Sequence, residues 1–188
     1  MLSGGQSRRF GHDKAALLHP DGRTLLARTC ALAAALPAAV VVVGPEAPPG
    51  VARWADPGEG PLAALAAAHA AFPEVTEALW LPVDLPCLDL PALRALAAPL
   101  PAGIDLRAAD AGHPPLPGWV GAAAIRRLGP AVAAGERSLR RALEALPALA
   151  LDAAALDAAG AHPHALRDAD TPAGWTALVG TPPAPAAR

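Results

Sequence analysis

The segment richest in chemistry lies at the start of the chain, where residues 2–14 read L-S-G-G-Q-S-R-R-F-G-H-D-K. Adjacent glycines let backbone N–H groups turn toward an anion in conformations closed to other residues, and a nearby hydroxyl adds a further donor. Two cationic side chains supply positive charge. The segment therefore predicts a phosphate-binding loop. Its expected contributors are Gly4, Gly5, Ser7, Arg8 and Lys14.

The loop is neither of the two common phosphate-binding patterns. Lys14 does not follow a glycine, as the G-x-x-x-x-G-K-[ST] loop requires, and the glycines are adjacent rather than spaced as in G-x-G-x-x-G. A solvated turn would explain a glycine pair alone. Lys14, however, is the one lysine beside 14 arginines. Because lysine acts on phosphate as a compact point charge, we favour a phosphate role.

Asp84 is a second residue placed for chemistry. It directly follows an apolar run, residues 78–83, and precedes Leu85 and Pro86. A carboxylate at the carboxyl end of a parallel strand lies where ligands of open α/β sheets bind. Such an oxygen can hold Mg²⁺ between phosphate groups. The alternative is an aspartate that caps a turn before proline; beside the glycine-rich loop, we favour the metal role.

The opening residues also resemble a known signature. They are similar to the L-A-G-G-x-S-x-R-M/F-G-x-D-K pattern of the molybdenum cofactor guanylyltransferases, and four further segments resemble that family in the same order. These segments are 60–65 (G-P-L-A-A-L), 81–88 (L-P-V-D-L-P-C-L), 113–118 (H-P-P-L-P-G) and 168–172 (D-A-D-T-P), where the family usually has N-T-P.

The resemblance implies a single-domain, three-layer, Rossmann-like α/β nucleotidyltransferase fold and a reaction. The enzyme would transfer GMP from GTP to molybdopterin with Mg²⁺ and release pyrophosphate. It implies that Lys14, Arg8 and Asp84 are catalytic and that Asp84 holds the metal. The implied nucleotide-binding residues are Leu2, Ser3, Gly4, Gly5, Ser7, Lys14, Asp56 and Asp84.

The other site residues each have a simpler explanation. Asp56 lies where the family has an aspartate that contacts guanine, but a solvated turn explains it equally well. His113 is a candidate for contact with the pterin, although it lies in a proline-rich loop. Arg137 and Ser138 are candidates for binding a substrate phosphate, although charges on one helix face are usually solvated.

Composition limits the protein's class. A net charge of −2 with 17% charged residues gives no basic field for nucleic acid. No long apolar stretch predicts a membrane span, so we expect a cytoplasmic protein. The two cysteines, Cys30 and Cys87, lack metal-ligand spacing and are expected to be reduced.

With 188 residues, we expect one domain over 1–180 and a disordered, proline- and alanine-rich tail over 181–188.

Strands that alternate with helices predict a mostly parallel sheet. Only Met1 and Leu2 precede the glycine loop, so the first strand is nearly missing and we expect the native start to lie upstream. Strands are predicted at 40–43, 78–83 and 104–108, and helices at 25–36, 61–71, 90–96, 138–146 and from 172 onward.

Two other functions remain open. The protein could be a CTP-dependent molybdenum cofactor cytidylyltransferase, or another small-molecule nucleotidyltransferase on the same fold. A rival of another class is a non-catalytic nucleotide- or cofactor-binding protein. Apo-molybdoenzymes or their chaperones are the further partners we expect.

Overall fold

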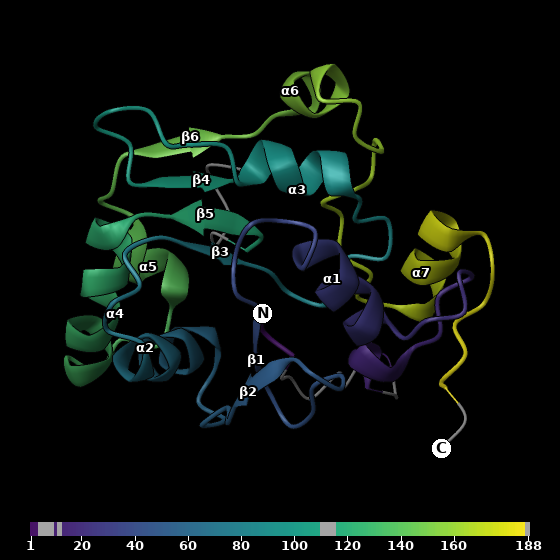
Figure 1. Ribbon diagram of the computed structural model, residues 1–188, viewed down its shortest axis with the longest axis horizontal. Helices are drawn as coiled ribbons and strands as arrows, with labels where there is room; N and C mark the ends of the chain where they lie inside the picture. Colours follow the sequence, from purple (N-terminus) through teal and green to yellow (C-terminus); the bar gives the residue numbers. More distant parts are fainter. Residues whose placement is uncertain (4–9, 11–12, 110–115, 187–188) are drawn as a thin grey trace.

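The computed structural model describes residues 1–3, 10, 13–109 and 116–186 (Figure 1). Its elements follow one another as η1 (Lys14–Ala16), α1 (Leu25–Ala33), β1 (Val41–Val43), β2 (Ala52–Trp54), α2 (Pro61–Ala71), β3 (Ala78–Trp80), α3 (Leu90–Leu96), β4 (Leu106–Ala108), β5 (Gly118–Val120), α4 (Ala122–Ala133), α5 (Leu139–Leu143), β6 (Ala148–Ala150), α6 (Ala153–Ala158) and α7 (Pro172–Val179).

The described strands form a mostly parallel arrangement, as predicted. β1 pairs in parallel with β2, and β4 pairs in parallel with β6. β5 is the exception, because it runs antiparallel to both of its neighbours, β3 and β4. The remaining described strands therefore share one direction, and the antiparallel strand was not predicted.

Residues 1–3 lie between the end of β1 and the segment after β3, and they bridge to both. Leu2 forms parallel bridges with Val43, at the end of β1, and with Pro82, just beyond β3. The Leu2 N–H donates to Leu81 O at 2.8 Å, and the Ser3 N–H donates to Val43 O at 2.9 Å. This short stretch joins the two sheets and ends where the glycine-rich loop begins.

Helices cover both faces of the sheet. α2, α4 and α5 pack against one another, and α3 contacts both α1 and α6 (Figure 1). Side chains alternate along the extended segment at β3: Trp80 packs in the cluster that includes α2, α4 and α5, whereas Leu79 and Leu81 pack with residues of the α1 and α3 group. The three-layer prediction is confirmed.

Helix starts follow local capping chemistry. The Thr24 hydroxyl accepts from Ala27 N at 3.2 Å to begin α1, and the Asp89 carboxylate accepts from Ala92 N at 2.9 Å to begin α3. α2 begins with proline at its first position, where no N–H is needed. These signals explain why the bounds of α2 and α3 match the prediction.

The end of the chain has defined contacts. Residues 181–188 were predicted to be a disordered tail, but backbone hydrogen bonds join Ala184 and Ala186 to Leu18 and Ala16. Both cysteines are free thiols, and Cys30 is buried. Within the described ranges, no helix is both long enough and apolar enough to cross a bilayer.

Candidate active site

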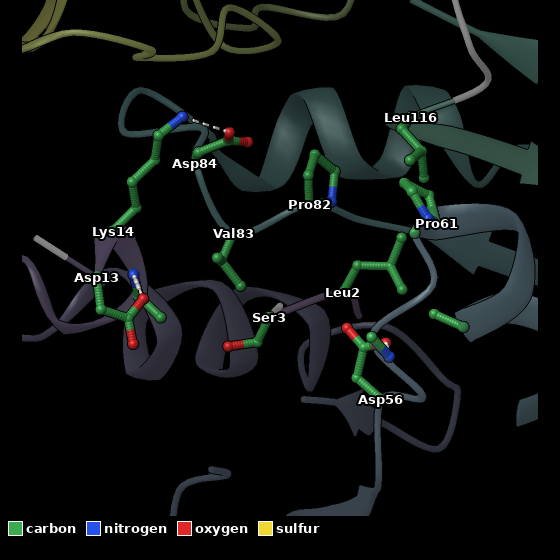
Figure 2. A pocket seen from close by; sticks show the side chains of 14 residues that line it. Leu2, Ser3, Asp13, Lys14, Asp56, Pro61, Pro82, Val83, Asp84 and Leu116 are labelled. Carbon is green, nitrogen blue, oxygen red and sulfur yellow. Dashed lines mark hydrogen bonds and ion pairs between the residues drawn. The ribbon is translucent and has the colours of Figure 1, made fainter. Parts of the chain in front are cut away.

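An open cavity of about 640 Å³ lies beside the short stretch of residues 1–3. It is bounded by that stretch, by η1, by the loop before α2 and by the segment that follows β3 (Figure 2). Five of the residues predicted to bind nucleotide line it, which brings together positions from three separate motifs. They are Leu2, Ser3, Lys14, Asp56 and Asp84.

Lys14 makes the central contact of the site. Its Nζ atom donates to Asp84 Oδ2 at 2.9 Å and to Asp170 Oδ1 at 2.6 Å. The lysine side chain is only 13% exposed, whereas those of Asp84 and Asp170 are 24% and 55% exposed. Figure 2 shows Lys14 and Asp84 directed toward each other at one side of the cavity.

These carboxylates control the charge of Lys14. Burial by itself would lower the pKa of the ammonium group, because it removes water from a charge. Hydrogen bonds and Coulomb attraction from Asp170 and Asp84 outweigh that effect and raise the pKa above its ordinary value. Lys14 is therefore a cation at neutral pH.

A third carboxylate completes a cluster at the same point. One oxygen each of Asp84, Asp168 and Asp170 lies within 4.8 Å of the others. Asp84 is anchored to this segment through the backbone as well, since the Ala169 N–H donates to its carbonyl oxygen at 3.0 Å. Oxygen ligands of this kind are those that hard divalent cations prefer, so the residues present fit a metal ion such as Mg²⁺.

Asp56 lies away from Lys14, in the loop before α2 (Figure 2). Its Oδ1 atom accepts from the Gly58 N–H at 2.8 Å, which fixes the direction of the carboxylate. Gly58 and Gly60, with φ angles of +78° and +95°, adopt backbone conformations that favour glycine. The two ends of the cavity thus carry carboxylates in different settings, one set paired with a cation and one held by a loop amide.

Two sequence candidates have structural roles. The Ser138 hydroxyl accepts from Arg141 N at 3.3 Å and caps α5. Arg137 pairs at 3.7 Å with Glu59, and both side chains are more than half exposed. Neither residue lines the cavity described here. Five other candidates lie outside the described residues: Gly4, Gly5, Ser7, Arg8 and His113.

Comparison with known proteins identifies the family. Residues 1–162 match the MobA-like NTP transferase domain. The chain belongs to this family.

One curated relative of this MobA-like chain is the molybdenum cofactor guanylyltransferase of Xanthomonas euvesicatoria pv. vesicatoria (strain 85-10). It is 42% identical over 101 residues, which make up 53% of this chain and 52% of the relative, so the match spans about half the length of each.

Solved structures support the same fold. The molybdopterin-guanine dinucleotide biosynthesis protein A of Archaeoglobus fulgidus aligns with a TM-score of 0.77 at 20% identity, over 95% of both chains. Rv0371c of Mycobacterium tuberculosis H37Rv aligns with a TM-score of 0.62 at 20% identity, over 96% of this chain and 95% of that one. The MobA-like nucleotidyltransferase fold is therefore confirmed.

Sequence reasoning gave no role to two carboxylates of the candidate cluster, Asp168 and Asp170. A helix was predicted from residue 172 onward, and the structure confirms it, since the Thr171 hydroxyl caps α7 by accepting from Gly174 N at 3.0 Å. The available signal was the pair of acidic residues before the cap, in a segment that resembles the family. Asp13, which caps η1 and lines the cavity, was also given no role.

Proposed function

We propose that this protein transfers GMP from GTP to molybdopterin, forming the guanine dinucleotide of the molybdenum cofactor and releasing pyrophosphate. A phosphate oxygen of molybdopterin attacks the α-phosphorus in line. The new P–O bond forms as the bond between the α-phosphorus and the α,β-bridging oxygen breaks. No covalent enzyme intermediate is required, so positioning and charge neutralisation must lower the barrier.

The observation that carries this proposal is the position of Lys14 at the cavity wall, between the carboxylates of Asp84 and Asp170. A cation already held by protein groups needs little reorganisation when negative charge develops near it. In the proposed complex, Lys14 neutralises charge on the triphosphate and on the departing pyrophosphate. Gly4, Gly5, Ser7 and Arg8, which lie outside the described residues, are proposed to bind the same phosphates, as the resemblance implies.

We assign a bound Mg²⁺ to the three-carboxylate cluster, with Asp84 as its principal ligand and Asp168 and Asp170 as further candidates. The support is the cluster's oxygen ligands, which lie within 4.8 Å of one another beside the cavity. When bound, the ion would neutralise triphosphate charge and polarise the reacting phosphorus centre. Within the protein, Asp84 is held by the Ala169 amide, which restrains the segment that carries it.

The position of Asp56 favours guanine over cytosine as the base of the bound nucleotide. One carboxylate oxygen accepts from the Gly58 amide, and a fixed carboxylate can accept from both the N1–H and the amino group of guanine. Cytosine cannot offer that pair of donors, so a site built around it would discriminate against CTP.

The test is pyrophosphate release by the purified protein with Mg²⁺ and molybdopterin, with GTP or CTP supplied in parallel. Release with GTP supports the proposal. Release with CTP alone would assign the protein to the cytidylyltransferase alternative. Nucleotide binding without release would favour the non-catalytic alternative.

Asp84→Asn is the matched variant for this assay, because it keeps the side-chain shape and removes the charge. We expect it to lower the rate of release on the order of 10²-fold or more, as for the loss of one preorganised stabilising group. Glu77→Gln, a surface change outside the cavity lining, is the control and should keep the wild-type rate.

The proposal includes a cytoplasmic location, which the free thiols of Cys30 and Cys87 support, because reducing compartments keep cysteines unpaired. Apo-molybdoenzymes or their chaperones are the proposed recipients of the product.

A further inference from the structure

After α7 the chain turns back along the segment that carries Lys14. The Leu18 N–H donates to Ala184 O at 2.8 Å, and the Ala186 N–H donates to Ala16 O at 3.0 Å. Leu17 and Pro185 form an antiparallel bridge between these two hydrogen bonds. In Figure 1, the yellow end of the chain descends from α7 beside the purple segment near the start. We call residues 181–186 the C-terminal strap.

The strap pairs with the last residue of η1, Ala16, and with the residues directly after it. η1 is a single 3-10 turn of three residues, Lys14–Ala16, closed by the Leu17 N–H donating to Lys14 O at 3.1 Å. One isolated turn has too few hydrogen bonds to offset the entropy of ordering its backbone. Its conformation must therefore depend on tertiary contacts.

The C-terminal part of the chain supplies such contacts on several sides. Asp170, just before α7, accepts from the Lys14 ammonium. Trp175, on α7, is fully buried in a cluster with Leu17 and Phe10. The strap then hydrogen-bonds to Ala16 and Leu18. Residues 170–186 thus contact the side chain of Lys14, the side chain of Leu17 directly after η1, and the backbone at Ala16 and Leu18.

We propose that the C-terminal strap is a positioning element for Lys14. It fixes the backbone beyond η1, so that the ammonium group is directed at Asp84 rather than free to turn into solvent. The role of Lys14 in catalysis rests on the proposed function, but its position can be measured without substrate. Because the family match ends at residue 162, this element lies beyond the matched domain.

Two proline variants distinguish the loss of the hydrogen bond between Ala186 and Ala16 from the effect of adding a proline to the strap. Ala186→Pro removes the N–H that donates to Ala16, whereas Ala184→Pro leaves the carbonyl that accepts from Leu18 in place. Both variants add one proline to a segment that already contains three, at 182, 183 and 185. The two variants therefore match in composition, but only Ala186→Pro removes the hydrogen bond from the strap to Ala16.

Lys14 is the only lysine in the chain, so it is a site-specific probe. Lysine labelled with ¹³C at Cε gives one side-chain resonance, and peptide mapping after brief treatment with acetic anhydride gives the rate of Lys14 acetylation. Amide hydrogen exchange at Leu18 reports whether the strap has separated. All three measurements are made on the full chain without nucleotide, so a failed transferase assay would leave their outcome unaffected.

We expect Ala186→Pro to speed both Leu18 exchange and Lys14 acetylation at least about fivefold, the factor that corresponds to losing one backbone hydrogen bond, and to shift the Cε resonance toward that of free lysine. Ala184→Pro should match the wild type. Faster Leu18 exchange with unchanged Lys14 acetylation would overturn the proposal. Unchanged Leu18 exchange would also overturn it, because the pairing would then not depend on this bond.

Discussion

The Nζ atom of Lys14 lies 2.9 Å from Oδ2 of Asp84, although 70 positions separate the two residues in the sequence. Asp170 approaches the same ammonium group at 2.6 Å. The single positive charge of Lys14 is therefore shared by two of the three carboxylates that we assign to the metal ion. A divalent cation that binds before the nucleotide must compete with Lys14 for these oxygens.

Lys14→Met removes the competing charge while keeping much of the side-chain length. We expect Mn²⁺, used as a probe for Mg²⁺, to bind the nucleotide-free variant about tenfold more tightly, since a charge-assisted hydrogen bond no longer has to be broken. Titration followed by electron paramagnetic resonance measures this affinity. Arg141→Met, which removes an exposed cation on α5, should leave it unchanged; equal or weaker binding to Lys14→Met would contradict competition.

The same Lys14→Met variant should have the opposite effect on turnover. Pyrophosphate release is expected to fall on the order of 10²-fold or more, because a preorganised positive charge is lost from the triphosphate site. Steady-state kinetics with GTP measure this change. Tighter metal binding combined with slower release would separate the two roles of the lysine, whereas unchanged turnover would remove Lys14 from the mechanism.

Gly44 brings the backbone after β1 close to Ser3. A Cβ atom at Gly44 would lie 2.7 Å from the Ser3 carbonyl oxygen, which is closer than two such atoms can approach. We therefore expect Gly44→Ala to displace Ser3 at the cavity wall, to weaken GTP binding and to lower the free energy of unfolding by about 1–3 kcal/mol. Calorimetric titration and urea denaturation measure the two effects.

Gly129→Ala is the matched control for this substitution. A Cβ atom at this position of α4 would meet nothing within 4 Å. The helix preference of alanine over glycine is opposed by crowding against the following Pro130, so stability should change by no more than about 1 kcal/mol in either direction, and GTP binding should not change. If both alanine variants behaved alike, the contact between Gly44 and Ser3 would have no role in shaping the site.

The sequence predicted the elements whose signals are local. Pro61 at a first helical position and the Asp89 cap mark the starts of α2 and α3, and an apolar run ending in a carboxylate marks the segment from β3 to Asp84. By contrast, β6 has the sequence Ala-Leu-Ala, which favours a helix, and only its pairing with β4 makes it a strand. Such an element depends on tertiary pairing that a local pattern does not contain.

Among the residues of the candidate site too, those with a local motif were predicted and those placed by tertiary contacts were not. Lys14 and Asp84 were identified because each has a local motif. Asp170 was given no site role, and its contact with Lys14 joins positions 156 residues apart. No local pattern specifies that contact, which arises because Ala169 hydrogen-bonds to Asp84 and α7 packs near η1.

Arg107 is a buried residue of β4 whose side chain reaches the end of α3, and it is only 6% exposed. Its guanidinium donates to the carbonyl oxygens of Leu96 at 3.0 Å and Pro99 at 3.0 Å, and also to that of Ala98. These groups lie at and beyond the end of α3, where helix carbonyls lack intrahelical partners. Arg107 therefore acts as a side-chain cap for this end of the helix.

Arg107→Met keeps the apolar stem and removes every donor. We expect the free energy of unfolding to fall by roughly 2–4 kcal/mol, because several carbonyl groups lose their partner and some remain buried. Urea denaturation followed by circular dichroism measures the loss. Arg94→Met, on the exposed side of α3, should change stability by no more than about 0.5 kcal/mol; similar losses in the two variants would contradict the capping role.

His69 and Trp80 link the pH of the solution to the stability of the core. The Trp80 indole N–H donates to His69 Nε2 at 2.9 Å, so this nitrogen must be unprotonated. Burial lowers the pKa of His69 below its ordinary value of 6.5. The folded state therefore binds the proton less well than the unfolded state does. The stabilisation is complete above pH 6.5 and is lost as the pH falls through the lower, folded-state pKa.

Urea midpoints at pH 7.5 and pH 5.0 test this link. The wild type should lose more stability between the two pH values than His69→Gln does, because glutamine can accept the indole hydrogen bond without titrating in this range. His164→Gln, which changes a histidine outside the sheet core, should retain the wild-type dependence. Equal pH dependence in the wild type and in His69→Gln would mean that the Trp80 hydrogen bond does not couple protonation to folding.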